Sequence, residues 1–209
     1  MFTGLIEKVC KAGAVIGGTS GMKLQVNLGF EAKIGDSVAI NGVCLTISRF
    51  QGQSAEFEVS GETVSRTTLK NLKTAAPVNI ERAMSANDRF GGHFVQGHID
   101  AVGKIKKIER KGDFWEFIFE SPKELKDYLI PKGSIAIDGV SLTVAGIDGN
   151  NFSTAIIPTT FENTIFKYAK VGDAVNIETD ILCRIVRTQL ENILPSKNLT
   201  MGKLKDLGF

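Results

Sequence analysis

The two histidines of the chain lie close together in a glycine-rich segment. His93 follows Gly91 and Gly92, and His98 follows Gly97. An imidazole that titrates near neutral pH can donate and accept protons, and neighbouring glycines let a ligand approach the backbone. A structural alternative is that one ring caps a turn and the other satisfies a buried carbonyl group. A zinc site is disfavoured, because it needs more ligands than this segment offers.

Two further stretches carry candidate reactive groups at equivalent positions. Residues 37–47 read SVAINGVCLTI and residues 134–144 read SIAIDGVSLTV, so that Asn41 is replaced by Asp138 and Cys44 by Ser141. A lone buried cysteine is more often a small apolar residue than a nucleophile. Asp138 precedes a glycine, where it could also form an Asx-turn. Both the chemical and the structural interpretation are therefore kept.

These stretches belong to an internal duplication. The repeat extends to Val78–Glu81 and Val175–Glu178, and near the start Gly4–Glu7 matches Gly97–Asp100. A long period with only two copies indicates a duplicated domain and not a solenoid. We predict one domain at residues 1–96, a second at residues 97–180, and a C-terminal segment at residues 181–209.

Short runs of β-branched or alternating residues, separated by glycines, dominate both copies. About six strands in roughly 90 residues, without the spacing of βαβ units, predict an all-β chain with a closed antiparallel sheet in each copy. Short helices are expected at residues 62–69 and 122–129. The runs expected to be strands are residues 23–28, 37–40, 44–50, 55–59 and 77–81, and then 115–120, 134–137, 141–147, 152–156 and 174–178.

The C-terminal segment has a different period. Apolar residues from Ile181 to Leu194 recur at helical spacing, and Pro195 ends the run. This amphipathic helix has no counterpart after the first copy. Its apolar face could pack on its own barrel or against symmetry mates, and we favour the second arrangement because complete barrels offer it no obvious core.

Composition restricts the class of protein. The 209 residues carry a net charge of +2, with both signs interspersed, which gives no basic surface for nucleic acid or an anionic membrane. Cys10, Cys44 and Cys183 fit no metal-binding or redox spacing. Without a signal peptide or a long apolar span, the sequence favours an intracellular, cytoplasmic protein.

Taken together, these motifs resemble those of riboflavin synthase, a family with two lumazine-binding barrels. The resemblance covers nearly the whole chain and depends on Met1–Gly4 with Glu7, on Asn41–Thr46 and Asp138–Thr143, on Gly91–Asp100, and on Ile157–Thr160. It implies two tandem six-stranded Greek-key β-barrels followed by a C-terminal α-helix. It also implies a homotrimer, no cofactor and no metal, and an association with lumazine synthase that occurs in some members.

The activity implied by the resemblance is a dismutation. Two molecules of 6,7-dimethyl-8-ribityllumazine exchange a four-carbon unit and give riboflavin and 5-amino-6-(ribitylamino)uracil. Two similar pockets would hold the two substrates face to face, with the reacting pair formed between the first barrel of one subunit and the second barrel of a neighbour. A first pocket is implied at Gly4, Leu5, Ile6, Cys44, Leu45, Thr46, Glu58, Val59, Ser60, Gly61, Glu62 and Thr63. A second is implied at Gly97, His98, Ile99, Lys132, Ser141, Leu142, Thr143, Ile156, Ile157, Pro158, Thr159, Thr160 and Phe161.

Roles follow as hypotheses. His98 would transfer the proton of the acidic C7 methyl group, with Thr3 nearby. An activated water or other nucleophile at C7 of the partner substrate would be generated or positioned by Ser37, Cys44, Asp138 and Ser141. The alternative function is a non-catalytic lumazine or flavin carrier, which would bind a chromophore without converting it. A nucleic-acid-binding barrel would need basic grooves interleaved with aromatic residues, and the sequence lacks that pattern.

Overall fold

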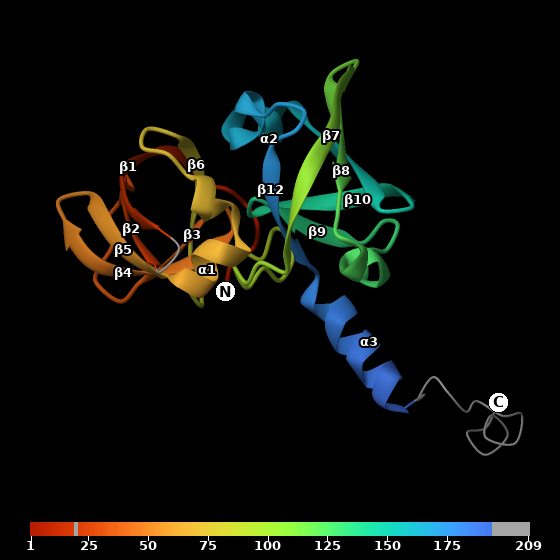
Figure 1. The fold of residues 1–209 in the computed structure, drawn as a ribbon, viewed down its shortest axis with the longest axis horizontal. Helices are drawn as coiled ribbons and strands as arrows, with labels where there is room; N and C mark the ends of the chain where they lie inside the picture. The colour runs from red at the N-terminus through yellow and green to blue at the C-terminus, as the bar shows by residue number, and fades with distance from the viewer. Residues whose placement is uncertain (19–20, 194–209) are drawn as a thin grey trace, which may run out of the picture.

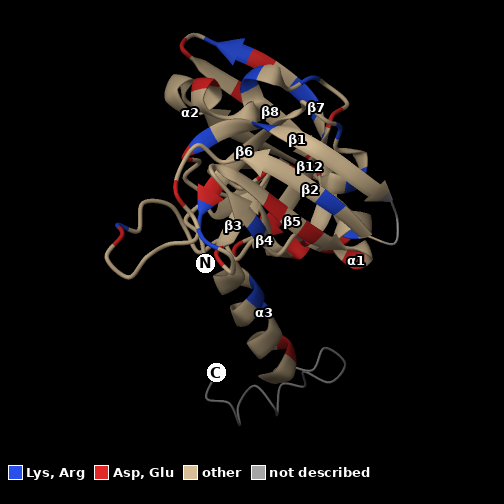
Figure 2. Ribbon diagram, turned by 90° about the vertical axis from the view of Figure 1, so that its left-hand side faces the viewer, with Lys and Arg blue, Asp and Glu red and all other residues tan. Residues whose placement is uncertain are grey.

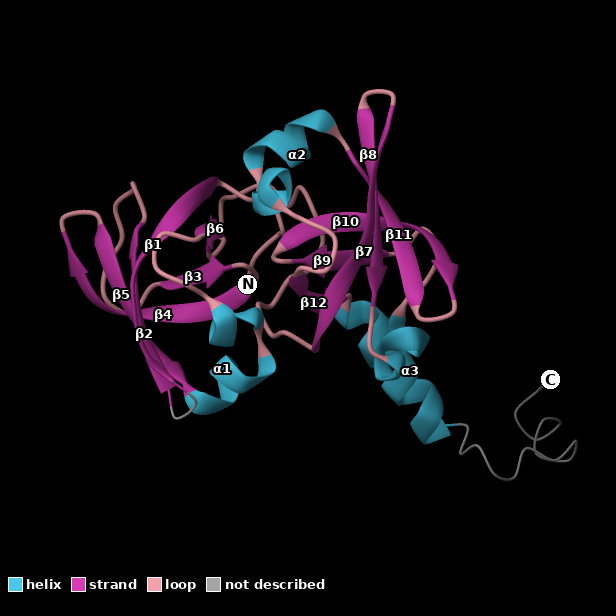
Figure 3. Cartoon of the chain, turned by 45° about the horizontal axis from the view of Figure 1, so that its top comes forward, coloured by secondary structure: helices cyan, strands magenta, loops and turns pink. Residues whose placement is uncertain are grey.

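The computed structural model describes residues 1–18 and 21–193. Two closed β-barrels lie side by side, and a helix extends away from the second barrel (Figure 1). Strands make up most of each barrel, and the N-terminus lies between the two barrels (Figure 3). The predicted all-β fold with two homologous antiparallel six-stranded barrels and a C-terminal helix is confirmed.

Both barrels have the same strand order. Going around the first barrel the order is β1-β2-β5-β4-β3-β6, and the second barrel repeats it as β7-β8-β11-β10-β9-β12. The first barrel comprises β1 (Lys8–Gly18), β2 (Gly21–Asn27), β3 (Ser37–Ile40), β4 (Val43–Gln51), β5 (Ser54–Ser60) and β6 (Pro77–Arg82). The second comprises β7 (Ala101–Lys111), β8 (Phe114–Glu120), β9 (Ser134–Ile137), β10 (Val140–Asp148), β11 (Asn151–Ile156) and β12 (Ala174–Thr179). Each predicted strand is present within two residues, and β1 and β7 complete the sheets.

Alternation of apolar and polar residues places one side chain in two inside each barrel. In β4, Val43, Leu45 and Ile47 are buried, whereas Cys44 and Thr46 lie on the outer surface. The second barrel has a core rich in aromatic side chains, including Phe117, Phe119 and Phe152. Because side chains fill both interiors, the candidate sites lie on the outer walls.

Short helices connect β5 to β6 and β11 to β12. They are α1 (Gly61–Arg66) with η1 (Thr68–Asn71), and α2 (Pro158–Asn163) with η3 (Ile165–Tyr168). A third short helix, η2 (Lys123–Tyr128), follows β8 where a helix is predicted. Ser60 begins α1 by accepting a hydrogen bond from the Thr63 N–H at 3.1 Å.

A buried network of amides joins the barrels. Asn79 donates its side-chain N–H to the Asp138 carbonyl at 2.9 Å, and Asn176 donates to the Asn41 carbonyl at 2.8 Å. Asn41 and Asp138 have φ angles of 47° and 46° at equivalent tight turns. The Asn41 side chain also accepts the backbone N–H of Asn79 at 2.7 Å, and the Asp138 side chain accepts the backbone N–H of Asn176 at 2.9 Å. The contacts between the two barrels are thus reciprocal at these four residues.

The C-terminal helix α3 runs over Ile181–Ile193. The Asp180 carboxylate accepts the Leu182 N–H at 3.0 Å at its start. Its apolar side chains are about half exposed, among them Leu182, Ile185, Val186 and Leu190. The helix therefore does not pack its apolar face on its own barrel. Leu194 and Pro195 lie outside the described residues.

Charged residues of both signs are interspersed over the ribbon (Figure 2). Within residues 1–18 and 21–193, no helix has the length and apolar character needed to cross a membrane.

Candidate active sites

The segments that precede each barrel cross over to the opposite barrel. We call residues 1–7 the first arm and residues 94–100 the second arm. They pair with each other through Phe2 and Val95, whose backbone groups exchange hydrogen bonds of 2.7 and 3.2 Å. Beyond this bridge, the Gly4 carbonyl accepts the Ser141 N–H at 2.8 Å, and the Gly97 carbonyl accepts the Cys44 N–H at 2.9 Å.

Packing of the next residues confirms the exchange. Ile6, from the first arm, packs against the core of the second barrel. Ile99, from the second arm, packs against the core of the first barrel. The first arm therefore belongs with Ser141, and the second arm belongs with Cys44.

Glycine is required where each arm meets the opposite strand. Gly4 and Gly97 have φ angles of 78° and 81°, which favour glycine. A Cβ on Gly97 would lie 2.5 Å from the Cys44 Cβ, and a Cβ on Gly4 would lie 2.6 Å from the Ser141 Cβ. Any side chain would push the arm away from the barrel wall.

A buried carboxylate fixes each arm. Glu81 accepts the N–H groups of Thr3 at 2.7 Å and of Gly4 at 3.1 Å, and also the Thr3 hydroxyl at 2.9 Å. The equivalent Glu178 accepts the N–H groups of Gln96 at 2.7 Å and Gly97 at 2.9 Å. Burial raises the pKa of both carboxyl groups, to about 7 for Glu178, although the bound N–H groups act in the opposite direction.

The wall of each barrel is open where the arm arrives. The ladder between β4 and β5 runs only to the pair Ile47 and Phe57, although β4 begins at Val43 and β5 continues to Ser60. Cys44 uses the open edge of β4 to bind Gly97. Since alternate residues of a strand direct their backbone groups to the same side, the N–H and C=O of Thr46 also face this edge.

The second barrel repeats the opening. The ladder between β10 and β11 ends at the pair Val144 and Thr154, whereas β10 begins at Val140 and β11 runs to Ile156. Ser141 binds Gly4 there, and Thr143 is equivalent to Thr46. An open strand edge offers alternating donors and acceptors, which suits the edge of a flat heterocycle.

These features define two sites. The first site is the open wall of barrel 1 around Cys44 and Thr46, with the second arm beside it. The second site is the open wall of barrel 2 around Ser141 and Thr143, with the first arm beside it. These contacts differ from the sequence-based grouping, which placed Gly4, Leu5 and Ile6 with Cys44, and Gly97, His98 and Ile99 with Ser141.

Several predicted binding residues turn their side chains into a core. These are Leu45, Val59, Leu142 and Ile156, all less than a tenth exposed. Phe161 stacks on Trp115 with ring centroids 4.2 Å apart and packs on the second core. At the first four positions only backbone groups are available to a ligand.

The outward-facing candidates are mainly hydroxyl and charged residues. Ser37 lies opposite Thr46 across β3 and β4, on the face that carries Cys44. Ser60 and Thr63 bind each other at 3.0 Å, next to Gly61. Glu58 pairs with Lys23 at 3.4 Å and Glu62 with Arg66 at 3.2 Å. At the second barrel the exposed residues are Lys132, Ile157, Pro158 and Thr159, with Thr160 half-buried.

His93 contributes a pair that the sequence did not assign. Its Nδ1 lies 2.7 Å from the Ser141 Oγ, and its N–H binds the Thr3 carbonyl at 3.1 Å. The ring is buried, and burial lowers the pKa of His93, opposed by the charge of Asp180. Its Nε2 is buried without a hydrogen-bond partner among the described residues. A neutral imidazole at this position can accept a proton from the serine hydroxyl.

The remaining candidates divide between the sites. His98 is exposed and lies on the second arm, at the first site. Thr3 lies beside Glu81 and His93, so its contacts place it with the second site and not with His98. Asp138 is buried in the amide network between the barrels, where burial raises its pKa to about 7. That position indicates a structural role for Asp138 instead of the predicted role at the reacting atoms.

Cavities lie near these features. One of about 440 Å³ is lined by Thr3, Leu5 and Glu81 beside the first arm. A larger one of about 580 Å³ opens between the barrels next to Asn41 and Asp138. Among the side chains that the structure describes, no group of three or more His, Cys, Asp or Glu residues could hold a metal ion.

Comparison with known proteins gives consistent results. The lumazine binding domain family matches residues 3–83 and residues 96–180. A riboflavin synthase of Actinobacillus pleuropneumoniae is 42% identical, over the full length of both chains. That of Photobacterium phosphoreum is 40% identical over all of this chain and 99% of its own. The riboflavin synthase of Saccharomyces cerevisiae is 36% identical over 98% of this chain and 94% of its own.

Solved structures show the same fold. LumP complexed with riboflavin aligns with a TM-score of 0.79 at 21% identity, over 86% of this chain and 99% of LumP. LumP complexed with 6,7-dimethyl-8-(1'-D-ribityl)lumazine aligns with a TM-score of 0.77 at 21% identity, over the same shares of the two chains. At this identity the likeness establishes the double-barrel fold alone.

Proposed function

The chain belongs to the riboflavin synthase family, and we propose that it converts two molecules of 6,7-dimethyl-8-ribityllumazine into riboflavin and 5-amino-6-(ribitylamino)uracil. The observation that carries this proposal is the presence of two equivalent open barrel walls on one chain, each with an arm beside it. A reaction between two copies of one substrate needs two such sites, one for the donor of the four-carbon unit and one for the acceptor.

Each site would bind the heterocycle by its polar edge. The backbone N–H groups of Thr46 at the first site and Thr143 at the second face the open wall and supply donors. Hydroxyl groups such as those of Thr63 and Thr160, at equivalent positions, are suited to the ribityl chain. Orientation of the two ring systems would then supply much of the rate enhancement.

The two sites differ in their reactive groups. At the second site, His93 can withdraw the Ser141 proton, so that the hydroxyl or a water held by it can add to C7 of one substrate. At the first site, the exposed His98 would take a proton from the C7 methyl group. The resulting carbanion is delocalised in the ring and adds to the activated partner. Donors on the open strands would stabilise the charge.

A homotrimer is part of the proposal. The apolar face of α3, with Leu182, Val186 and Leu190, is about half exposed and suits a bundle with symmetry mates. Assembly would bring the first site of one subunit opposite the second site of another. A cytoplasmic location and an association with lumazine synthase also belong to this proposal, supported by family membership.

The second candidate function is a chromophore carrier, favoured by the fold shared with LumP. Full-length relatives at 36 to 42% identity favour the enzyme. The test is to incubate the purified chain with 6,7-dimethyl-8-ribityllumazine alone and to follow riboflavin and the pyrimidine product by chromatography. Equal amounts of the two products are expected. Binding with no riboflavin formed would support the carrier and refute the enzyme.

Matched variants strengthen this test. Cys44→Ala alters the first site and Ser141→Ala alters the second, at equivalent positions of the two barrels. If one site holds the donor and the other the acceptor, the two variants reduce turnover by different factors. Equal factors would contradict the division of roles between the sites.

A further inference from the structure

Each arm ends at a residue with a carboxylate side chain, Glu7 in the first arm and Asp100 in the second, at equivalent positions. Glu7 accepts the Arg82 N–H at 2.8 Å, and Asp100 accepts the Thr179 N–H at 2.8 Å. Arg82 and Thr179 are the last residues of β6 and β12, at equivalent positions. Each arm is therefore attached to the end of the last strand of its own copy, after it has crossed the opposite barrel.

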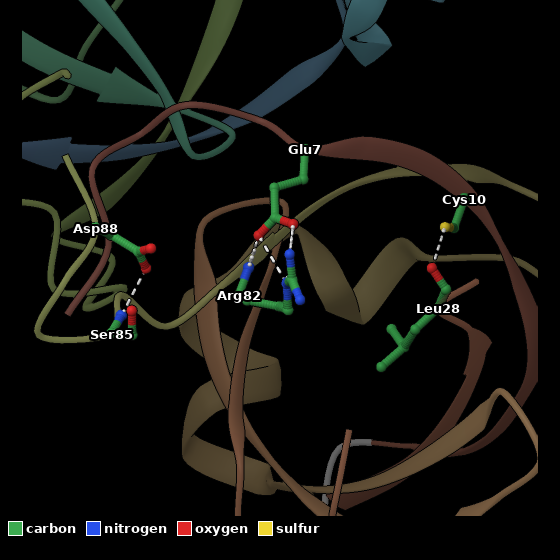
Figure 4. Close-up of polar contacts among 6 residues, drawn as sticks. All are labelled: Glu7, Cys10, Leu28, Arg82, Ser85 and Asp88. Atoms are coloured by element: carbon green, nitrogen blue, oxygen red, sulfur yellow. Dashed lines mark hydrogen bonds and ion pairs between the residues drawn. The ribbon is translucent and has the colours of Figure 1, made fainter. Parts of the chain in front are cut away.

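The charged partner of this carboxylate has a different source in each copy. In the first copy, the Arg82 side chain binds Glu7, with Nε at 2.9 Å and Nη2 at 2.8 Å (Figure 4). In the second copy, the Thr179 side chain carries no charge and donates only a hydroxyl group, at 2.7 Å. The guanidinium comes instead from Arg184, whose Nη1 lies 2.6 Å from the Asp100 Oδ1. Arg184 belongs to α3, which the first copy lacks.

The second arm is short between its anchors. Glu178 holds the N–H groups of Gln96 and Gly97, and the Asp100 N–H donates to the Ile177 carbonyl at 2.9 Å. His98 and Ile99 lie between these anchors. The Asp100 side chain is 11% exposed and that of Arg184 39%, so the ion pair is partly shielded from solvent and carries more energy than a surface pair.

A second attachment holds α3 on the second barrel. Arg187 pairs with Asp127 of η2 at 2.7 Å, and its guanidinium lies over the Tyr128 ring at 4.9 Å from the centroid. This attachment does not touch the second arm. The helix therefore contacts the arm through Arg184, and it contacts the barrel separately through Arg187.

We propose that Arg184 is a positioning residue for the first site: through Asp100, α3 holds the second arm in place against Cys44. A shift of α3 would then alter a pocket on the opposite barrel. Because the same helix carries the exposed apolar face, assembly of subunits would act on the first site through this contact. The effect on turnover rests on the proposed function, whereas the effect on the arm does not.

The test is Arg184→Gln in the full chain, with amide hydrogen exchange measured residue by residue. Loss of the ion pair should speed exchange at Gln96, Gly97 and His98 by about tenfold, which corresponds to about 1.4 kcal/mol. The equivalent amides of Thr3, Gly4 and Leu5 are an internal control and should not change. Arg184→Lys, which keeps the charge, should restore most of the protection.

Two control variants separate the arm from the helix. Arg187→Gln weakens the attachment of α3 to η2 but keeps the pair of Arg184 with Asp100, so it should speed exchange at Gln96–His98 less than Arg184→Gln does. Arg82→Gln should speed exchange in the first arm alone. Unchanged exchange at Gln96–His98 in Arg184→Gln, or an equal increase in both arms, would overturn the proposal.

Substrate binding gives an independent result. In Arg184→Gln we expect weaker substrate binding at the first site and normal binding at the second, measured by calorimetry with 6,7-dimethyl-8-ribityllumazine. Equal weakening at both sites would overturn the proposal. If the wild-type protein formed no riboflavin, the proposed function would fail, but the exchange experiment would still decide the role of Arg184.

Discussion

The imidazole Nδ1 of His93 lies 2.7 Å from the hydroxyl oxygen of Ser141, and the two residues come from different segments of the chain. His93 precedes the second arm, and Ser141 lies on β10 of the second barrel. The first arm binds both residues: its Thr3 carbonyl accepts the His93 N–H, and its Gly4 carbonyl accepts the Ser141 N–H. The pair is thus part of the second site and not an isolated surface contact.

Replacement of His93 tests this pair. His93→Gln should lower kcat by about a hundredfold, the usual contribution of one acid–base group, with a smaller effect on KM. Ser141→Ala should have a similar effect, and the double variant should be no worse than either single one. Additive losses would show that the two side chains act independently.

The pH profile provides a second measure of the same residue. Burial lowers the pKa of His93, so the neutral ring persists to more acidic pH than an ordinary histidine. We expect the acid limb of kcat below a pH of about 6.5, the ordinary value for histidine. An acid limb above that value would indicate that another group controls the rate.

Gly97→Ala should damage the first site selectively. The new Cβ would meet the Cys44 Cβ at 2.5 Å in a backbone conformation that alanine disfavours. We expect a loss of stability of about 2 kcal/mol or more and binding of one lumazine per chain instead of two, measured by calorimetry. Gly112→Ala is a matched control, because Gly112 has a φ of 63° with no atom within 4 Å of the added Cβ. Two intact sites in Gly97→Ala would contradict the assigned contact.

Asp138→Asn should make stability less dependent on pH. Burial raises the pKa of Asp138 to about 7 from 3.8, so the folded protein binds this proton more tightly than the unfolded chain. The associated stabilisation is complete below about pH 4 and is lost as the pH rises to about 7. In the variant, folding should bind about one proton fewer over that pH range. The measurement is the slope of the free energy of unfolding against pH, from denaturant titrations at several pH values.

The converse variant is Asn41→Asp, which adds a buried carboxyl at the equivalent turn and should steepen the pH dependence. Asp138→Asn should also retain most of the turnover, because Asn41 fills the same position in the first copy. A large loss of kcat with stability unchanged would restore Asp138 to a chemical role.

Val186→Lys should disrupt subunit assembly. Val186 is 58% exposed on the apolar face of α3, so a lysine there should have little effect on the fold of the single chain and opposes packing between helices. We expect a smaller species in light scattering and loss of turnover with both sites still able to bind. Thr188→Lys, on another face of the helix, should behave as wild type. An unchanged oligomer in Val186→Lys would show that α3 is not the assembly surface.

Much of the fold followed from local sequence. Alternating residues in stretches such as Ser54–Ser60 encode which face is buried, and the repeat of residues 37–47 at 134–144 encodes the second barrel. The helix at the C-terminus was predicted from its period alone. These properties depend on neighbours in the chain, which is why sequence reasoning reaches them.

The sites were predicted less well. Gly4 and Cys44 belong to one copy in sequence, but Gly4 contacts Ser141 in space because the arms cross. Periodicity within a copy carries no information on such an exchange. His93 stood out as one of two histidines beside glycines, but its contact with Ser141 spans 48 residues and needed the structure. The available signal was the pair of equivalent glycines at positions 4 and 97, because Ile6 and Ile99, two residues after them, pack on the other barrel.

Crossed arms have a consequence for how such a chain could have arisen. In a molecule with one copy, the arm would not reach the wall of its own barrel. Two such molecules would have to exchange their N-terminal arms, as in a domain-swapped dimer. Duplication and fusion of the gene would preserve this exchange of arms inside one polypeptide. Each half could then diverge, as Cys44 and Ser141 have, without losing the partner on which its own pocket depends.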